Sequence, residues 1–221
     1  MKEIILDTET TGLSVKDGHR IVEIGCVEIE NLIPTKKSFH CYLNPERKVS
    51  EKALAVHGYS DDFLSNKKKF KEIVDDFLKF IEDKRLIIHN AEFDLSHLNN
   101  ELKIIGRKSI KNEVVDTLVL ARNKFPGSST SLDALCKKYR IDNSKRKNHS
   151  ALIDCDLLTK VYINLIDQKE PTLDFKANYE NKTEKINVQK SYFKKIVYPT
   201  AEEIKLHAEY LKNKIKRNFF S

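Results

Sequence analysis

Two acids near the amino terminus have a spacing that could bind a metal ion. The apolar run Ile4-Ile5-Leu6 precedes Asp7, and Glu9 follows two positions later. We predict a short buried strand over residues 3–7 that ends in these acids. Residues two apart in a strand point to the same face, so Asp7 and Glu9 would lie side by side. Crowded carboxylates repel each other unless a cation lies between them, which favours a hard divalent ion. The alternative is an exposed strand end with two solvated acids.

Three residues further along the chain could complete such a site. Asp94 follows a predicted strand over 85–89 and begins a helix, and Asp154 lies one turn into a helix that begins at Ala151. His149 precedes Asp154 by five residues, which turn a helix by about 500°, so the two would not share a helix face. We therefore place His149 on the loop before the helix. There it could move above the fixed acids and act as a general base.

The elements that must position these residues follow a recognisable order. Strands predicted over 3–7, 21–29 and 38–43 are joined by short turns, which indicates an antiparallel meander. Later strands over 85–89 and 114–116 alternate with helices. The predicted helices cover residues 50–57, 70–81, 94–105, 117–122, 131–136 and 151–165. This order predicts an α/β fold in which helices flank a mixed sheet.

Length and composition exclude several classes of protein. The 221 residues are 40% hydrophobic and 33% charged, which fits one large domain, or one domain with a tail. No apolar run approaches the ~20 residues that a membrane span needs. The sequence leads directly into a strand, so we expect no signal peptide and a cytoplasmic protein. The four cysteines (Cys26, Cys41, Cys136 and Cys155) lack metal-finger spacing, and we expect them to be reduced thiols.

The net charge of +7 is concentrated near the carboxyl terminus. Residues 168–221 carry 12 Lys+Arg against 7 Asp+Glu, whereas residues 1–167 carry 28 against 26. The nearly neutral body makes basicity weak evidence for nucleic-acid binding. We predict a domain over 1–167, a polar linker over 168–191 and a binding tail over 192–221.

The tail contains a predicted amphipathic helix. Thr200-Ala201-Glu202-Glu203 has the form of a capping box. Ile204, Ala208, Leu211 and Ile215 then form one apolar stripe on a basic helix. This stripe could dock on a partner or pack back on the body, and the long polar linker favours a partner.

The ordered set of acids and histidine resembles the DEDD exonucleases of the His subtype, and within them the proofreading epsilon subunits of bacterial DNA polymerase III. The resemblance covers residues 1–167. It rests on the acids above together with these segments: Gly18-His19-Arg20-Ile21-Val22-Glu23-Ile24-Gly25, Tyr42-Leu43-Asn44-Pro45-Glu46-Arg47, Val56-His57-Gly58, Ile88-His89-Asn90-Ala91-Glu92-Phe93-Asp94, Phe125-Pro126-Gly127, Ser131-Leu132-Asp133-Ala134-Leu135-Cys136 and Ile141-Asp142-Asn143-Ser144-Lys145-Arg146.

The resemblance implies a fold, a reaction and a set of roles. The fold would be ribonuclease-H-like, with a five-stranded mixed sheet. The reaction would be 3′→5′ removal of mismatched terminal deoxynucleotides as 5′-monophosphates. Two Mg²⁺ or Mn²⁺ ions would be held by Asp7, Glu9, Asp94 and Asp154, with Asp7 bridging them and His149 acting as the base. The 3′-terminal nucleotide would contact Asp7, Glu9, Thr10, Gly12, Lys52, His57 and Asp154.

The resemblance also implies partners. They are DNA 3′ ends, the catalytic alpha subunit through the tail, the theta subunit and the sliding clamp. A clamp-binding hexapeptide would fall at residues 170–175, where Glu170 replaces the expected Gln. Lys52 stands where relatives often carry an acid, and Ser150 replaces the Gly that usually follows the catalytic histidine.

Several residues and functions have competing interpretations. From local sequence, His57 could cap a helix end, His89 could be a hydrogen-bonded core histidine, and Asp116 is better explained as a helix cap than as a fifth ligand. Two other functions compete with proofreading. One is cleavage of short RNAs, which the tail argues against. The other is a structural adaptor of the polymerase with no catalysis, which the complete set of ligands argues against.

Overall fold

The computed structural model describes residues 1–144, 146, 148–166 and 198–214. The chain divides into two compact units, Met1–Asp174 and Phe175–Ser221, and each is described by itself. The proposed linker, the hexapeptide and Ile215 lie outside the described residues. Among the helices that the structure describes, none has the length and apolar character needed to cross a membrane.

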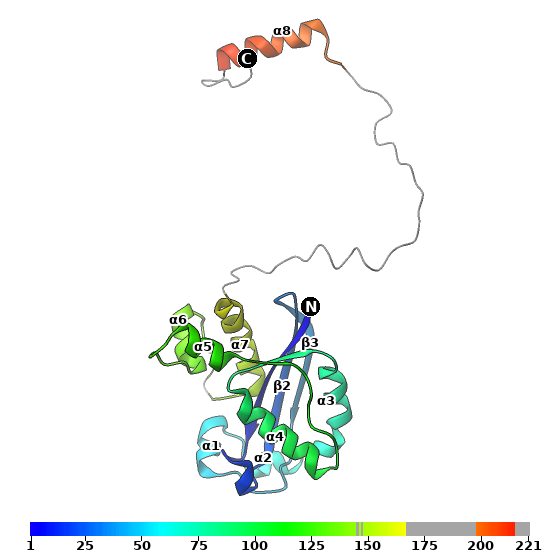
Figure 1. Cartoon of the computed structure of the whole chain (residues 1–221), viewed down its shortest axis with the longest axis vertical. Helices are drawn as coiled ribbons and strands as arrows, with labels where there is room; N and C mark the ends of the chain where they lie inside the picture. Colours follow the sequence, from blue (N-terminus) through cyan, green and yellow to red (C-terminus); the bar gives the residue numbers. More distant parts are fainter. Residues whose placement is uncertain (145, 147, 167–197, 215–221) are drawn as a thin grey trace, which may run out of the picture. The chain divides into compact units, whose positions relative to one another are not determined.

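A five-stranded mixed sheet forms the centre of the first unit, in the order β3-β2-β1-β4-β5 (Figure 1). Its strands are β1 (Lys2–Thr10), β2 (Ile21–Glu30), β3 (Ile33–Tyr42), β4 (Arg85–Ile88) and β5 (Val114–Asp116). The first three strands pair antiparallel. Strand β4 pairs parallel with β1, and β5 pairs parallel with β4. The predicted meander and mixed sheet are therefore confirmed.

Helices cover both faces of this sheet (Figure 1). They are α1 (Glu51–His57), α2 (Asp61–Ser65), α3 (Val74–Ile81), α4 (Ala91–Ile104), α5 (Thr117–Lys124), α6 (Leu132–Tyr139) and α7 (Ala151–Leu165). One core cluster lies on the side of α3 and α4, and the other lies on the side of α5, α6 and α7.

Strand β1 supplies side chains to both clusters because successive residues of a strand point to opposite faces. Ile4 and Leu6 belong to the cluster on the side of α3 and α4, whereas Ile5 belongs to the cluster on the side of α7. Asp7 and Glu9 lie two and four positions after Ile5, so their side chains point to the same face of the sheet as Ile5. The alternation thus directs both acids toward the face that α7 covers.

Three predicted boundaries were wrong. Strand β1 runs to Thr10, so the acids lie within the strand instead of ending it. The strand predicted over 38–43 begins at Ile33, because pairing with β2 continues to the Glu30–Ile33 pair. The helix predicted over 70–81 is a 3₁₀ turn, Phe70–Glu72, followed by α3. Ile73 separates the two with a φ of −119°, which is outside the usual helical range.

The four cysteines are free, and Cys26, Cys136 and Cys155 are buried. Burial raises the pKa of the Cys26 and Cys155 thiols well above the usual value, which keeps them protonated. They act as small core side chains, as expected from the sequence.

The second unit contains α8 (Ala201–Lys214). The predicted capping box is confirmed, because the Thr200 hydroxyl accepts from the Glu203 amide while the Glu203 carboxylate accepts from the Thr200 amide. Within this unit Ile204, Leu206 and Tyr210 are more than half exposed.

Candidate active site

All the residues that the sequence singled out for chemistry border one cleft of about 820 Å³ in the first unit. Its walls include the four acids and the histidine: Asp7, Glu9, Asp94, His149 and Asp154. They also include the proposed substrate contacts: Thr10, Gly12, Lys52 and His57. Residues separated by more than 140 positions in the sequence are therefore gathered by the fold.

The two strand acids are held in an unfavourable electrostatic environment. Loss of water raises the pKa of Asp7 well above its usual value, and the charges of Asp94, Glu9 and Asp154 raise it further. Burial, followed by the charges of Asp154 and Glu23, raises the pKa of Glu9 from 4.5 to about 8. Such carboxyls release their protons more readily when a cation lies among them.

Asp94 is fixed in the first turn of α4, where it is buried. One of its oxygens accepts hydrogen bonds from the Thr8 amide at 2.9 Å and the Thr8 hydroxyl at 2.7 Å. Burial raises its pKa to about 7, although these hydrogen bonds oppose the shift. Asp94 is thereby tied to the strand residue between Asp7 and Glu9.

Asp116 holds the start of the helix that carries Asp94. It accepts from the backbone amides of Asn90 and Ala91 at 3.1 and 3.0 Å, and it caps α5 through Leu118. Its interpretation as a helix cap is confirmed. His89 also has a partner, because its Nδ1 lies 2.9 Å from the Thr117 hydroxyl.

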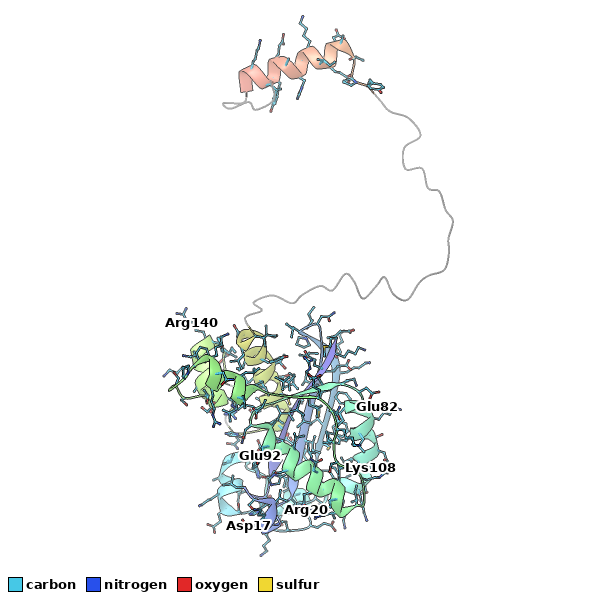
Figure 2. The ribbon with its side chains drawn as sticks, viewed as in Figure 1. Asp17, Arg20, Glu82, Glu92, Lys108 and Arg140 are labelled. Carbon is cyan, nitrogen blue, oxygen red and sulfur yellow. The ribbon has the colours of Figure 1, made fainter. Side chains whose placement is uncertain are left out.

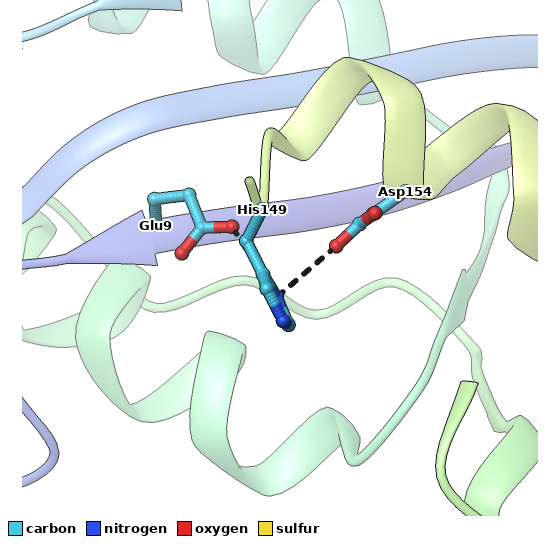
Figure 3. A group of neighbouring side chains, drawn as sticks. All are labelled: Glu9, His149 and Asp154. Atoms are coloured by element: carbon cyan, nitrogen blue, oxygen red, sulfur yellow. Dashed lines mark ion pairs between the residues drawn. The ribbon is translucent and has the colours of Figure 1, made fainter. Parts of the chain in front are cut away.

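His149 lies between Glu9, on the sheet, and Asp154, on α7 (Figure 3). Its Nδ1 is 3.5 Å from Asp154 Oδ2 and 4.0 Å from Glu9 Oε1. One ligand atom from each of the three residues lies within 4.8 Å of the others. His149 is on the loop before α7, as predicted, and its side chain is 44% exposed, so substrate and water can reach it.

Asp154 has an arginine partner that the sequence did not assign. Arg146 donates to both Asp154 oxygens, from Nε at 2.6 Å and from Nη2 at 2.7 Å. Burial acts to raise the pKa of Asp154, but the hydrogen bonds from His149 and Arg146 and the charge of Arg146 outweigh it. The pKa of Asp154 is lowered as a result, and the residue stays ionised. Arg146 could not be assigned from sequence because it is one basic residue in a basic loop.

The donor set fits a divalent cation. Four carboxyls converge on one cleft, and oxygen ligands are those that hard divalent ions prefer. Burial is the largest cause of the raised pKa values of Asp7, Glu9 and Asp94, and a cation among these carboxyls would lower those pKa values. Asp7, Glu9, Asp94 and Asp154 would hold the metal, which would stabilise negative charge on reacting oxygens.

The proposed substrate contacts differ in how firmly they are held. His57 is buried at the end of α1, where Tyr59 donates to its Nδ1 and its Nε2 lies 3.2 Å from the Thr10 carbonyl. The Gly58 amide, and not the His57 ring, donates to the Leu54 carbonyl at the end of α1, so the interpretation of His57 as a helix cap is wrong. A Cβ on Gly12 would lie 2.3 Å from the His19 ring, so a larger residue at this position would require the ring to move. Lys52 is exposed at the edge of the cleft.

The loop between β1 and β2, which borders the cleft, is anchored to α4. Arg20, labelled in Figure 2, donates from Nε and Nη2 to the two oxygens of buried Glu101, each at 2.6 Å. The Thr11 amide donates to the Arg20 carbonyl at 2.8 Å. This two-point pair fixes the far end of the loop relative to the helix that bears Asp94.

Glu23 is a positioning residue that sequence reasoning missed. It is fully buried in β2 and accepts from the Ala151 amide at 3.0 Å, the Ser150 hydroxyl at 3.1 Å and the Tyr59 hydroxyl at 2.8 Å. It thereby fixes the start of α7, between His149 and Asp154. The only signal in the sequence was an acid inside an apolar strand.

Replacement of Glu23 by alanine is expected to lower kcat of the expected nuclease reaction about 10- to 100-fold, because a displacement of about 1 Å at the reacting groups has an effect of that size. The free energy of unfolding should fall by about 2–4 kcal/mol, since buried donors lose their acceptor. The pH profile should also change, because Glu23 raises the pKa of Glu9. Steady-state kinetics across pH and urea unfolding would measure these effects, and an unchanged pH profile would assign Glu23 a purely structural role.

Gly25 allows α7 to approach the sheet closely. It pairs with Asp7 across β1 and β2, and a Cβ there would lie 2.5 Å from the Ala151 carbonyl carbon and 2.7 Å from the Leu152 nitrogen. Both neighbours are backbone atoms at the start of α7. This close approach brings Asp154 toward Asp7.

Gly25→Ala is expected to displace the first turn of α7, lowering the free energy of unfolding by about 1–3 kcal/mol and kcat by roughly 100-fold. Gly127→Ala is a matched control, because Gly127 has a φ of +76° but a Cβ added there would have no neighbour within 4 Å. It should lower stability by about 1 kcal/mol and leave kcat unchanged. Equal kcat values for the two variants would contradict this role of Gly25.

Fold and site together define the class of protein, a metal-dependent exonuclease. A family model described as Exonuclease matches residues 4–162. Two solved structures share the fold. The nuclease domain of 3'hExo, a DEDDh family member, bound to rAMP, has a TM-score of 0.66 at 17% identity, over 76% of this chain and 92% of that one. Exonuclease X in complex with 5' overhanging duplex DNA has a TM-score of 0.60 at 24% identity, over 75% and 92%.

Sequence relatives define the family within this class. DNA polymerase III subunit epsilon of Rickettsia typhi is 48% identical, over 96% of each chain. The subunit of the same name from Salmonella typhimurium is 39% identical, over 93% of this chain and 90% of that one. The chain belongs to the family of DNA polymerase III epsilon subunits, the proofreading exonucleases.

Proposed function

We propose that this protein removes mismatched 3′-terminal deoxynucleotides from DNA, in the 3′→5′ direction, as 5′-monophosphates. The observation that carries the proposal is the convergence of Asp7, Glu9, Asp94, Asp154 and His149 on one cleft. This arrangement supplies both a set of oxygen ligands and a base, which phosphodiester hydrolysis requires.

The four acids would bind two divalent cations, Mg²⁺ or Mn²⁺, with Asp7 contributing to both. When bound, the pair of ions would stabilise charge on the attacking and leaving oxygens. Fixed positions support this role, because Asp94 is tied to Thr8 and Asp154 is held on α7.

His149 would accept the proton of the attacking water. His149 Nδ1 lies 2.8 Å from Arg146 Nη2 and 3.5 Å from Asp154 Oδ2, and these two contacts orient the ring for that role. The exposed ring can move toward the terminal phosphodiester while Glu9 and Asp154 stay fixed.

Thr10, Gly12 and His57 would seat the terminal nucleotide against the end of β1. The rigid contact between His57 and Thr10 supports a preformed seat. Lys52 would reach the nucleotide from the exposed edge of the cleft.

The second unit would bind the catalytic alpha subunit of DNA polymerase III. Within the predicted stripe, Ile204 and Ala208 are exposed and Leu211 is partly exposed, which supports a helix that docks on a partner. A tethered nuclease would act at a high effective concentration on the primer end. Contacts with the theta subunit and the sliding clamp remain predictions from the sequence resemblance.

The decisive test is digestion of primer–template DNA with a matched or mismatched 3′ end, in Mg²⁺, Mn²⁺ or EDTA, with and without the alpha subunit. We expect release of deoxynucleoside 5′-monophosphates, faster from the mismatch, and none in EDTA. A short RNA substrate in parallel distinguishes the alternative nuclease activity. Activity in EDTA, or faster digestion of RNA than of DNA, would overturn the proposal.

A further inference from the structure

Arg146 has an unusual position for a residue of a basic loop. Its side chain is only 7% exposed, and its guanidinium has three partners: Asp154, Asp133 and His149. Asp154 and Asp133 both border the cleft, and Arg146 forms an ion pair with each of them. Arg146 is therefore a buried part of the cleft and not a residue of the exposed surface.

The guanidinium uses the same groups as the proposed metal site. It donates to both Asp154 oxygens, and its Nη2 also lies 2.8 Å from His149 Nδ1. Asp154 and His149 are two of the three residues whose ligand atoms lie within 4.8 Å of one another. A divalent ion held there would compete with the guanidinium for these lone pairs, and the two positive charges would repel each other.

Asp133 offers the guanidinium a second partner outside this group. It lies in the first turn of α6 with a side chain that is 56% exposed, and it accepts from Arg146 Nη1 at 2.7 Å. Asp133 also accepts from Asn143 at 3.0 Å, which orients its carboxylate. Rotation of Arg146 about this contact would release Asp154 without leaving the guanidinium unpaired.

We propose that Arg146 is an exchangeable counter-cation, which neutralises Asp154 before metal binding and moves toward Asp133 when a divalent ion binds. The inference rests on the proposed ligand set. It assigns Arg146 and Asp133 to the control of metal affinity, with opposite effects: Arg146 competes with the ion, and Asp133 helps to remove the competitor. A fixed arginine that merely orients Asp154 would instead strengthen metal binding.

The test compares Mn²⁺ affinity, by titration calorimetry, with the midpoint of thermal unfolding in EDTA, using the full-length protein. Arg146→Met is expected to bind Mn²⁺ about tenfold more tightly than the unaltered protein. Its metal-free midpoint should fall by about 2–4 °C, because Asp154 loses its partner, and saturating Mn²⁺ should restore it. Lys137→Met removes the same charge from an exposed position of α6 and should change neither value.

The second variant, Asp133→Asn, removes the negative charge of an exposed side chain. It should weaken Mn²⁺ binding several-fold, whereas Asp76→Asn, an exposed acid on α3, should have no effect. Weaker Mn²⁺ binding by Arg146→Met, or unchanged binding by both cleft variants, would overturn the inference. Absence of Mn²⁺ binding by the unaltered protein would instead overturn the proposed metal site.

Discussion

Asp7→Asn is expected to lower the exonuclease rate by about a thousandfold or more, which corresponds to about 4 kcal/mol in the barrier. Asp7 is the acid on which the charges of Asp94, Glu9 and Asp154 converge. In the proposed mechanism it contributes to both metal positions, so an amide there disturbs the whole site. Primer digestion in Mg²⁺ measures the loss.

The same substitution should stabilise the metal-free protein. The pKa of Asp7 is raised by loss of water and by neighbouring charges, so its ionised form is disfavoured in the folded state. Asp7→Asn should therefore raise the unfolding midpoint in EDTA at pH 8, while it abolishes activity. Glu9→Gln should retain part of the Mn²⁺ binding, and Asp76→Asn should alter neither activity nor stability. Full activity of Asp7→Asn would refute the assignment.

Stability of the metal-free protein is expected to fall steeply between about pH 4.5 and pH 8. Glu9 has a folded pKa of about 8 against 4.5 for the usual glutamate, and Asp94 has about 7 against 3.8. The folded protein therefore holds protons that the unfolded chain releases in this range. Stability from these groups is complete below the unfolded pKa and is lost as the pH rises through the folded pKa.

The size of this effect follows from the shift at Glu9. At about 1.36 kcal/mol per pH unit, a rise from 4.5 to about 8 corresponds to on the order of 5 kcal/mol. Thermal unfolding in EDTA from pH 4.5 to pH 9 should show the decline. Saturating Mg²⁺ should restore stability above pH 7, because the ion replaces the protons. A curve in EDTA that is flat over this range would contradict the electrostatic description of the cleft.

Local sequence signals were sufficient to place the proposed metal ligands and the proposed base on their strand, loop and helices. The spacing of Asp7 and Glu9 predicts a shared face, because strand geometry repeats every two residues. The positions of Asp94 after a strand, and of His149 and Asp154 around the start of a helix, also depend on local signals. Each of these local predictions agrees with the structure. Roles in catalysis and substrate contact remain proposals, which the variants above can test.

Long-range contacts could not be read from the sequence. Glu23 differs little from other acids in a strand until pairing brings it beneath the Ser150 hydroxyl and the Ala151 amide. Arg146 becomes distinct only when the fold places it against Asp154 and Asp133. The apolar spacing over residues 70–81 is likewise compatible with one helix, although the structure divides this segment at Ile73.

The physical reason for this division is the range of the interactions. Strand alternation, helix caps and runs of apolar residues act over a few positions, so the sequence by itself determined most of the elements and the places of the acids and of His149 on them. Burial and charge interactions act across whatever residues the fold brings together. Only the tertiary structure could decide that the pKa of Glu9 rises while that of Asp154 falls, because burial and neighbouring acids dominate at Glu9, whereas hydrogen bonds from His149 and Arg146 dominate at Asp154.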